Sequence, residues 1–320
     1  MNTKDLSLFR KPQRLYMYFR AESVLRFLEH HSLKLSDPTQ FNDPFDCKVD
    51  YNRSLQPTGF LDAHPNAEHL NEWNIISLDN KHFDTISSYG ISCFTTDADN
   101  ILMWAYYAEG QKGVCVEFDT SKDPVFFKDL HKVIYSEQLG CIKRENGEWS
   151  YMDVYTTKLG CWEHEKEWRV IKPNMANTFF PIKPQAITGI IFGCASGDFR
   201  GKKDYDIQIY EDIIKLLNRP IYHHVRIQQI QTARTTNTLQ HADLPFFVME
   251  HKDNTISIIS TQEQYLYLEK TTDESSQRKQ IYSVPMNKLE EYKTPNPLPL
   301  GLYYIHNGKD PMQTIRVIPN

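Results

Sequence analysis

The segment EHEKEWR at residues 163–169 brings together the side chains best suited to chemistry in this sequence. It is typical of a β-strand stopped by Pro173, and residues two apart on a strand share a face. Glu165, Glu167 and Arg169 are therefore expected to project together. Two carboxylates about 7 Å apart on one face suit a site that stabilises a developing cation, and a neighbouring arginine can keep one of them ionised. The same pattern also fits a solvated strand face of mixed charge.

Common metal and phosphate motifs are missing from the sequence. A zinc-protease site needs a histidine four positions after His164, where Trp168 stands. His223 and His224 are adjacent on an expected strand and so face opposite sides. There is no G-x-S-x-G, Walker or G-x-G-x-x-G motif, so neither a serine hydrolase nor a common phosphate cradle is indicated. We therefore expect no metal site.

The expected strand YGISCFTT, residues 89–96, carries hydroxyl groups on both faces. Ser92 and Thr96 share one face with Phe94, and Thr95 lies on the other. A hydroxyl at a strand end can hold a catalytic carboxylate or a ribose hydroxyl, and it can equally cap the helix that follows. The pattern alone favours capping, and both roles stay open.

Aromatic residues are the unusual feature of the composition, at 12%, with 18 Tyr and 17 Phe. Trp104 and Tyr107 fall on an expected helix capped by Asp99 or Asn100, and Tyr18 lies on the first expected strand. Each ring taken singly fits core packing. Tyrosines on a strand beside a cleft can also stack on a planar heterocycle.

Charge and hydropathy exclude several classes of protein. The chain has 320 residues, and its 36 Lys and Arg against 41 Asp and Glu give a net charge of -5, which disfavours a general polyanion binder. No segment resembles a secretory signal or is long enough to span a bilayer. The six cysteines form no C-x-x-C pair and fit reduced core cysteines. We expect a cytoplasmic protein without a membrane partner.

The pattern of apolar residues predicts alternating strands and helices. Helices are expected at 22–30, 99–107, 150–159 and 204–217, and strands at 14–20, 89–95, 112–119, 165–171, 187–194 and 221–229. The loop SDPTQFNDPFD at 36–46 has two prolines and several Asx residues.

A polar shift at 232–239 predicts two domains, a core at 1–232 and a small antiparallel β-rich module at 233–320. Residues 252–254 and Asn307-Gly308 are the expected hairpin turns of that module.

Taken in order, these segments resemble a bacterial domain family long catalogued as uncharacterised and associated with abortive-infection-type phage defence. The resemblance covers about residues 14–230 and rests on LYMYFR, LKLSDPTQFNDPFDC, ISCFTT, NILMWAYYAEGQKGVCVEFD, EHEKEWRVI and ITGIIFGC. The family's corresponding motifs are L-Y-x-Y, F-N-D-P-F-D, S-C-F-S, M-W-x-x-Y, G-x-x-x-x-F and E-x-E-W-R.

The order of the segments is also similar to that of the ADP-ribosyltransferase superfamily. This resemblance implies an α+β fold with two small, partly split β-sheets and flanking helices, followed by the C-terminal β-rich module. It implies NAD as a co-substrate. Glu167 would be the catalytic glutamate that binds the nicotinamide-ribose hydroxyl and stabilises the oxocarbenium ion. Glu165 would orient the acceptor, and Ser92, with Thr95 or Thr96 nearby, would brace Glu167.

The resemblance also implies which residues hold NAD. Tyr18, or else Arg20, would hold it on the first strand, where many transferases carry a histidine. Asn42, Asp43 and Asp46 either line the site or form Asx turns that shape the loop. The aromatic residues of the motifs would wall one cleft, among them Phe94, Trp104 and Tyr107.

The expected function is that of a NAD-dependent ADP-ribosyltransferase acting as a bacterial toxin, effector or phage-defence protein. Its macromolecular acceptor stays open between protein and nucleic acid, and a cognate antitoxin or defence protein would be its partner. A NAD glycohydrolase uses the same chemistry without transfer.

The alternative from another class is a non-catalytic binding or immunity module with an aromatic cleft, which predicts well-solvated Glu165 and Glu167. A third is a metal-dependent nuclease using Asp43, Asp46 and Glu167.

Overall fold

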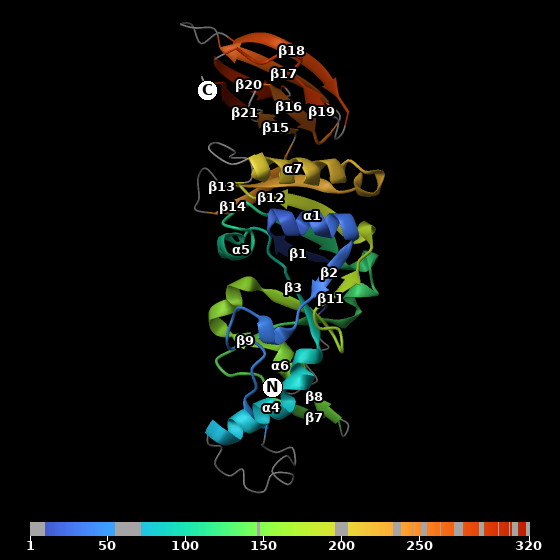
Figure 1. The fold of residues 1–320 in the computed structure, drawn as a ribbon, viewed down its shortest axis with the longest axis vertical. Helices are drawn as coiled ribbons and strands as arrows, with labels where there is room; N and C mark the ends of the chain where they lie inside the picture. Colours follow the sequence, from blue (N-terminus) through green and yellow to red (C-terminus); the bar gives the residue numbers. More distant parts are fainter. Residues whose placement is uncertain are drawn as a thin grey trace.

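The computed structural model of the chain describes most of the core and much of the C-terminal part. The described residues are 10–54, 72–145, 148–195, 204–232, 238–244, 246–250, 255–262, 264–271, 278–287, 291–299, 301–306, 308 and 313–317. Within them, no helix has the length and apolar character needed to cross a membrane. Figure 1 shows one large sheet with helices beside it, and a second group of strands beyond α7.

One mostly antiparallel sheet of eight strands organises the core, as an α+β fold requires. Its order is β14-β13-β12-β4-β1-β3-β10-β5, and β12 and β13 form its one parallel pair. The strands are β1 (Arg14–Phe19), β3 (Gly90–Thr95), β4 (Val114–Asp119), β5 (Leu130–Lys132), β10 (Glu167–Lys172), β12 (Ile187–Phe192), β13 (Arg226–Thr232) and β14 (Leu239–Asp243). The core thus holds a single large sheet rather than the two small sheets expected from the sequence.

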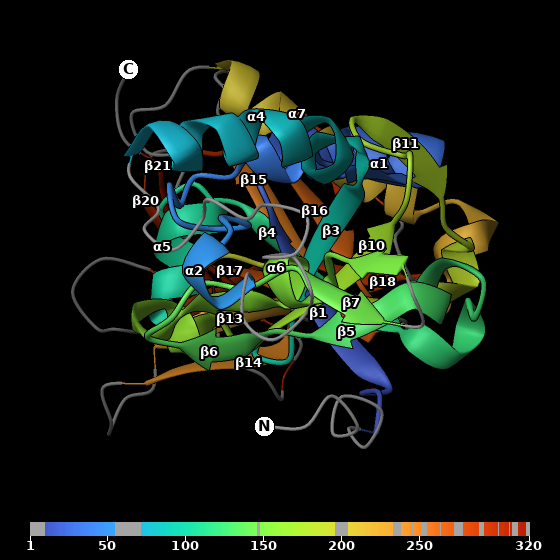
Figure 2. The same ribbon diagram turned by 90° about the horizontal axis from the view of Figure 1, so that it is seen from below.

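Helices pack on both faces of this sheet because alternate strand residues are apolar on each side. On one face, α1 (Ala21–His30) and α7 (Asp204–Leu217) contact each other and share the main hydrophobic cluster with Leu15 and Phe118. Figure 2 shows these two helices on the same side of the molecule. On the other face, α5 (Ile101–Tyr107) buries Trp104 against the β1 tyrosines. The side chain of Asn100 accepts the Leu102 and Met103 N–H groups, so Asn100 is the residue that caps α5.

A smaller hydrophobic cluster lies beyond the β3–β10 half of the sheet. It joins Tyr51, Ile86, Ile171 and Tyr155. The helices of this region are α2 (Tyr51–Ser54), α4 (Glu72–Ser88) and α6 (Met152–Thr156). Short strand pairs complete the core: β2 (Ser32–Leu35) with β11 (Thr178–Pro181), β6 (Ile134–Ser136) with β9 (Thr157–Leu159), and β7 (Lys143–Glu145) with β8 (Glu148–Ser150).

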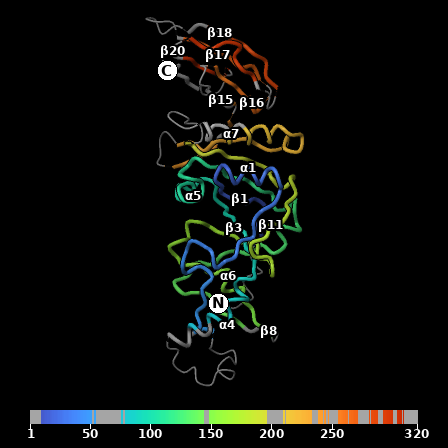
Figure 3. Tube along the Cα trace, in the orientation of Figure 1, coloured from blue at the N-terminus to red at the C-terminus, as the bar shows by residue number. Residues whose placement is uncertain are grey.

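The C-terminal strands form two further antiparallel sheets with a separate hydrophobic cluster. One sheet contains β15 (Phe246–Glu250), β16 (Ile256–Ser260) and β19 (Glu291–Lys293). The other contains β17 (Gln264–Thr271), β18 (Arg278–Met286), β20 (Gly301–His306) and β21 (Gln313–Val317). Figure 3 shows these strands and α4 at opposite ends of the molecule. The expected turns at 252–254 and Asn307 lie outside the described residues.

Three elements differ from the expected ones, each for a local reason. The helix expected at 150–159 ends at Thr156, and β9 follows it. The strand expected from Glu165 begins at Glu167, since Lys166 has a φ of 47°. The strand expected from 221 begins at Arg226 because residues 220–222 form a 3-10 turn with proline at its start. In addition, β14 continues the large sheet past the expected boundary at residue 232.

Candidate functional site

A cavity of about 200 Å³ lies where strands β1 and β3 separate. The pairs β1–β4 and β3–β10 run in register along six residues each, whereas β1 and β3 are in register only at Tyr16 and Thr95. Side chains from both faces of the sheet therefore border the opening, including Tyr18 with Met17 from β1 and Cys93 with Phe94 from β3. The volume is well above what one water molecule needs.

The lining of this cavity combines aromatic rings with charged groups. The aromatic members are Tyr16, Tyr18, Phe41, Phe94 and Tyr107, and the charged members are Asp46, Lys158, Glu165 and Glu167. Both glutamates of the E-x-E segment are thus at the cavity, although they are only 3% and 4% exposed. The solvated carboxylates that a pure binding module would show are not found.

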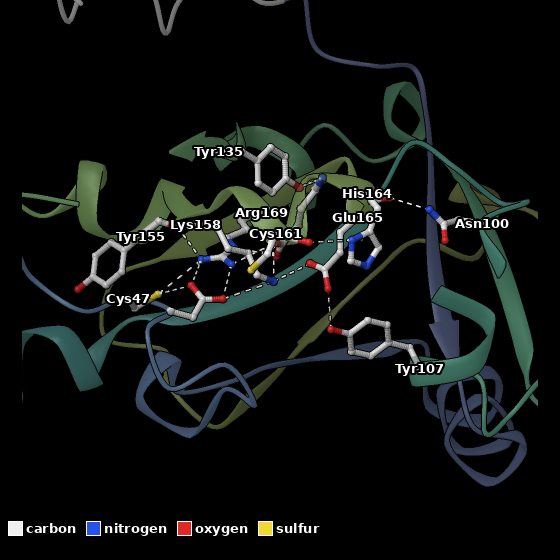
Figure 4. Close-up of polar contacts among 12 residues, drawn as sticks. Cys47, Asn100, Tyr107, Tyr135, Tyr155, Lys158, Cys161, His164, Glu165 and Arg169 are labelled. Carbon is white, nitrogen blue, oxygen red and sulfur yellow. Dashed lines mark hydrogen bonds and ion pairs between the residues drawn. The ribbon is translucent and has the colours of Figure 1, made fainter. Parts of the chain in front are cut away.

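Glu165 and Glu167 meet at one ammonium group. Glu165 ends a 3-10 turn (Gly160–Glu165), and the left-handed Lys166 redirects the chain into β10. Lys158 Nζ then lies 2.6 Å from Glu165 Oε2 and 3.3 Å from Glu167 Oε2. In Figure 4, Glu165 extends between Lys158 and the Tyr107 hydroxyl. The structure brings the two carboxylates together by a turn, not by the shared strand face expected from the sequence.

Arg169 joins this pair to the loop that carries Asp46. Its guanidinium is fully buried and binds both Asp46 oxygens, at 2.9 and 2.7 Å. It also donates to Glu167 at 2.8 and 3.0 Å and to the Tyr155 carbonyl at 2.9 Å. Asp46, Lys158, Glu165, Glu167 and Arg169 are called the charged cluster below.

The charged cluster contains three carboxylates and two cations, a formal charge of -1. Burial alone would raise the pKa of Glu167, but Arg169 and Lys158 outweigh burial and lower it to about 2. Burial alone would lower the pKa of Lys158. The surrounding carboxylates, of which Glu167 has the largest effect, outweigh burial and raise this pKa above its usual value. Such a buried site with one excess negative charge favours a positive charge in the adjoining cavity.

The lowered pKa of Glu167 predicts a specific acid sensitivity. A carboxyl whose pKa is lower in the folded than in the unfolded state stabilises the fold only where it is ionised. The contribution of Glu167 is present above about pH 4.5 and is lost as the pH falls toward about 2. Urea unfolding across this window is expected to show a shallower loss of stability for Glu167→Gln than for the wild type. Parallel curves for the two proteins would contradict the assignment.

Two tyrosines hold the glutamates from other elements. The Tyr107 hydroxyl on α5 donates to Glu165 Oε1 at 2.7 Å, and burial, followed by Glu165 itself, raises the pKa of this phenol. Tyr107 therefore stays protonated and remains a donor. On β6, the Tyr135 hydroxyl oxygen accepts the backbone N–H of Glu167 at 2.8 Å.

Ser92 does not support Glu167, contrary to the expectation from the sequence. Ser92 stands opposite Val170 in the β3–β10 ladder, on the face of the main hydrophobic cluster, and its hydroxyl donates to the Lys34 carbonyl at 2.6 Å. Cys93, the next residue, faces the charged cluster and hydrogen-bonds to Glu167. Burial and Glu167 raise the pKa of this thiol, so it remains a donor.

The residues expected to bind NAD divide into two groups. Tyr18, Phe94, Thr95, Asn42 and Tyr107 all line the cavity. Trp104 does not line it; its ring is fully buried and packs edge-on against Tyr18 at 5.1 Å. Arg20 is exposed at the start of α1 and is also outside the lining.

The acidic residues of FNDPFD have different roles. Asp43 Oδ1 accepts the Phe45 N–H at 2.9 Å, which is an Asx turn, while Asp46 binds Arg169 and Lys158. The described residues contain no group of three or more His, Cys, Asp or Glu side chains arranged to hold a metal ion. Of the three acids in the nuclease hypothesis, Asp46 and Glu167 line the cavity and pair with Arg169 and Lys158, whereas Asp43 is outside the lining.

Lys158, Tyr135 and Cys93 are site residues that the sequence analysis missed. Lys158 fell within an expected helix, although the adjacent Thr156-Thr157 pair is β-branched and favours a strand. The fold and the site together define a mixed α+β protein with an aromatic cavity above a buried, negatively charged cluster. No family model, curated protein or solved structure matches the chain.

Proposed function

We propose that the protein is a NAD-consuming ADP-ribosyltransferase that acts as a bacterial toxin, effector or phage-defence protein. The observation that carries the proposal is the meeting of Glu165 and Glu167 at an aromatic cavity between β1 and β3. The resemblance in sequence assigns these two glutamates to the reaction and the first strand to NAD binding.

The chemistry of the cavity suits cleavage of a positively charged N-glycoside. When the bond between ribose and nicotinamide breaks, its electron pair goes to the nicotinamide nitrogen and positive charge develops on the ribose. Preorganised carboxylates next to that charge lower the barrier. Glu167 would accept the ribose hydroxyl proton in a hydrogen bond, and Glu165 would orient the attacking group of the acceptor.

The lining fits the nicotinamide-ribose end of NAD in particular. The rings of Tyr18, Phe41 and Tyr107 offer surfaces for a planar heterocycle, and the excess negative charge suits the nicotinamide cation. Arg20 lies outside this lining, so Tyr18 is the better candidate on the first strand.

The decisive test follows label from NAD carried on the adenylate. Purified protein would be incubated with labelled NAD and bacterial extract, and both label transfer and free nicotinamide would be measured. Glu167→Gln is expected to reduce both by at least about 100-fold, because it removes a charge next to the developing cation. Nicotinamide release without transfer would identify a glycohydrolase instead.

A matched control separates chemistry from folding. Asp123→Asn alters another buried carboxylate, whose oxygens accept the Phe126 and Lys183 N–H groups away from the cavity. This variant is expected to keep its NAD activity at a temperature where it is folded. If wild type and Glu167→Gln consume NAD equally, the proposal is wrong.

A further inference from the structure

Lys158 reaches the charged cluster from a strand pair that lies outside the large sheet. It sits on β9, which pairs in parallel with β6 so that Lys158 is opposite Tyr135. Both residues then contact Glu167, Tyr135 at the backbone N–H and Lys158 at the carboxylate. The β6–β9 pair therefore brings two separate groups to the same glutamate.

The ammonium of Lys158 is shared by all three carboxylates. It lies 2.6 Å from Glu165, 3.3 Å from Glu167 and 3.6 Å from Asp46, with its side chain only 5% exposed. Trp162 covers it, with the ring centroid 5.0 Å from Nζ. Among the described residues, Arg169 pairs with Asp46 and Glu167, whereas Lys158 alone pairs with Glu165.

Apart from Arg169, which pairs with Glu167, the groups that the described residues place against Glu165 and Glu167 carry no positive charge. From their own elements, α5 supplies the neutral Tyr107, β6 the neutral Tyr135, and β3 the Cys93 thiol. The loop after η2 (Pro38–Gln40) supplies Asp46, which is itself negative, and Cys47 beside Arg169. Two carboxylates that share a site repel each other, which raises the pKa of one of them unless a cation compensates their charge.

We propose that Lys158 is a positioning residue that keeps Glu165 and Glu167 ionised and facing the cavity at the same time. The inference rests on the proposed function for its role in the reaction, because a cation-stabilising pair works only with both charges present. Without Lys158, Glu165 loses its one paired cation among the described residues, and we expect one of the two glutamates to take up a proton. The cluster then keeps a formal charge of -1, but only one of the two glutamates remains ionised beside a developing cation.

The ionisation of Glu165 and Glu167 can be measured without any assumption about the reaction. Carbon-13 carboxyl spectra of glutamate-labelled protein would be recorded against pH for the wild type, Lys158→Met and Lys158→Arg. Glu165→Gln and Glu167→Gln spectra assign the two signals. Lys158→Met is expected to show a carboxyl that titrates at least about one pH unit higher than in the wild type, and Lys158→Arg is expected to restore the wild-type curve. An unchanged titration in Lys158→Met overturns the inference.

The second arm measures NAD consumption against pH for the same proteins. In Lys158→Met the acidic limb of the rate profile is expected to move up by about one unit, with activity recovering at higher pH. A uniform loss at all pH values would show a merely structural role and contradict the proposal. If the wild type consumes no NAD, the proposed function fails while the carboxyl titration still decides the role of Lys158.

A second variant controls for misfolding of Lys158→Met, since removing one partner of a buried ion pair is destabilising. The double variant Lys158→Met/Glu165→Gln removes one charge of each sign and keeps the cluster at a formal -1. It is expected to fold and to lose the raised carboxyl titration. If that titration persists in the double variant, it does not arise from repulsion between Glu165 and Glu167, and the inference is wrong.

Discussion

Replacing Arg169 with methionine is expected to lower the free energy of unfolding by about 3–5 kcal/mol, because it leaves buried carboxylates without their partner. The guanidinium has no exposed area and makes two-pronged contacts with both Asp46 and Glu167. Lys158 remains within 3.6 Å of these acids, but one ammonium cannot compensate three carboxylates. The loop that carries Asp46 would then lose its attachment to β10.

Urea unfolding of Arg169→Met at neutral pH measures this effect. Lys215→Ala is a suitable control, because Lys215 pairs with Asp212 on the surface of α7 and such pairs contribute less than about 1 kcal/mol. Adding Asp46→Leu to Arg169→Met removes one uncompensated acid and is expected to recover part of the loss. Equal stability of Arg169→Met and wild type would show that the cluster is not held by its charges.

Replacing Trp104 with alanine is expected to cost a similar amount, about 3–5 kcal/mol, through a cavity rather than a charge. The ring is fully buried in the cluster on the α5 face, and its Nε1 donates to the Ala98 carbonyl at 2.7 Å. It also packs edge-on against Tyr18, whose hydroxyl binds the Asp97 carbonyl at 2.9 Å. Loss of Trp104 therefore loosens the wall of the cavity as well as the core.

The same unfolding measurement tests this prediction, with Trp149→Ala as the control. Trp149 is 39% exposed on β8, so its removal is expected to change the free energy of unfolding by less than about 1 kcal/mol. Trp104→Phe, which keeps an aromatic ring, is expected to fall between the two. A Trp104→Ala protein as stable as Trp149→Ala would mean that α5 does not depend on this ring.

Periodicity and capping predicted the elements of the core because these signals are local. The strand from Arg14 and the helix ending at His30 follow from alternation and amphipathic spacing, and Asn100 was identified as one of two caps. The single eight-stranded sheet was not predicted, since the order of strands depends on long-range pairing that no local pattern records. The pairing of β14 with β13, across the expected boundary at residue 232, was not predicted for the same reason.

The lining of the cavity was predicted in part. Glu165, Glu167 and Tyr18 reach the cavity as expected, because the segments that carry them are distinctive in sequence. Ser92 does not contact Glu167 because adjacent residues of a strand face opposite sides of the sheet. The next residue, Cys93, contacts Glu167 instead. The role of Lys158 and the pairing of Asp46 with Arg169 could not be predicted from the sequence, since both arise only when distant segments pack together.

The contact between Asp46 and Arg169 joins residues 123 positions apart. Closing so long a loop costs conformational entropy before the contact repays it, so this contact is expected to form after the local elements. A chain still emerging from the ribosome carries Tyr18 and Asp46 long before it carries Arg169. The growing polypeptide therefore cannot form the complete cavity before Arg169 has been synthesised.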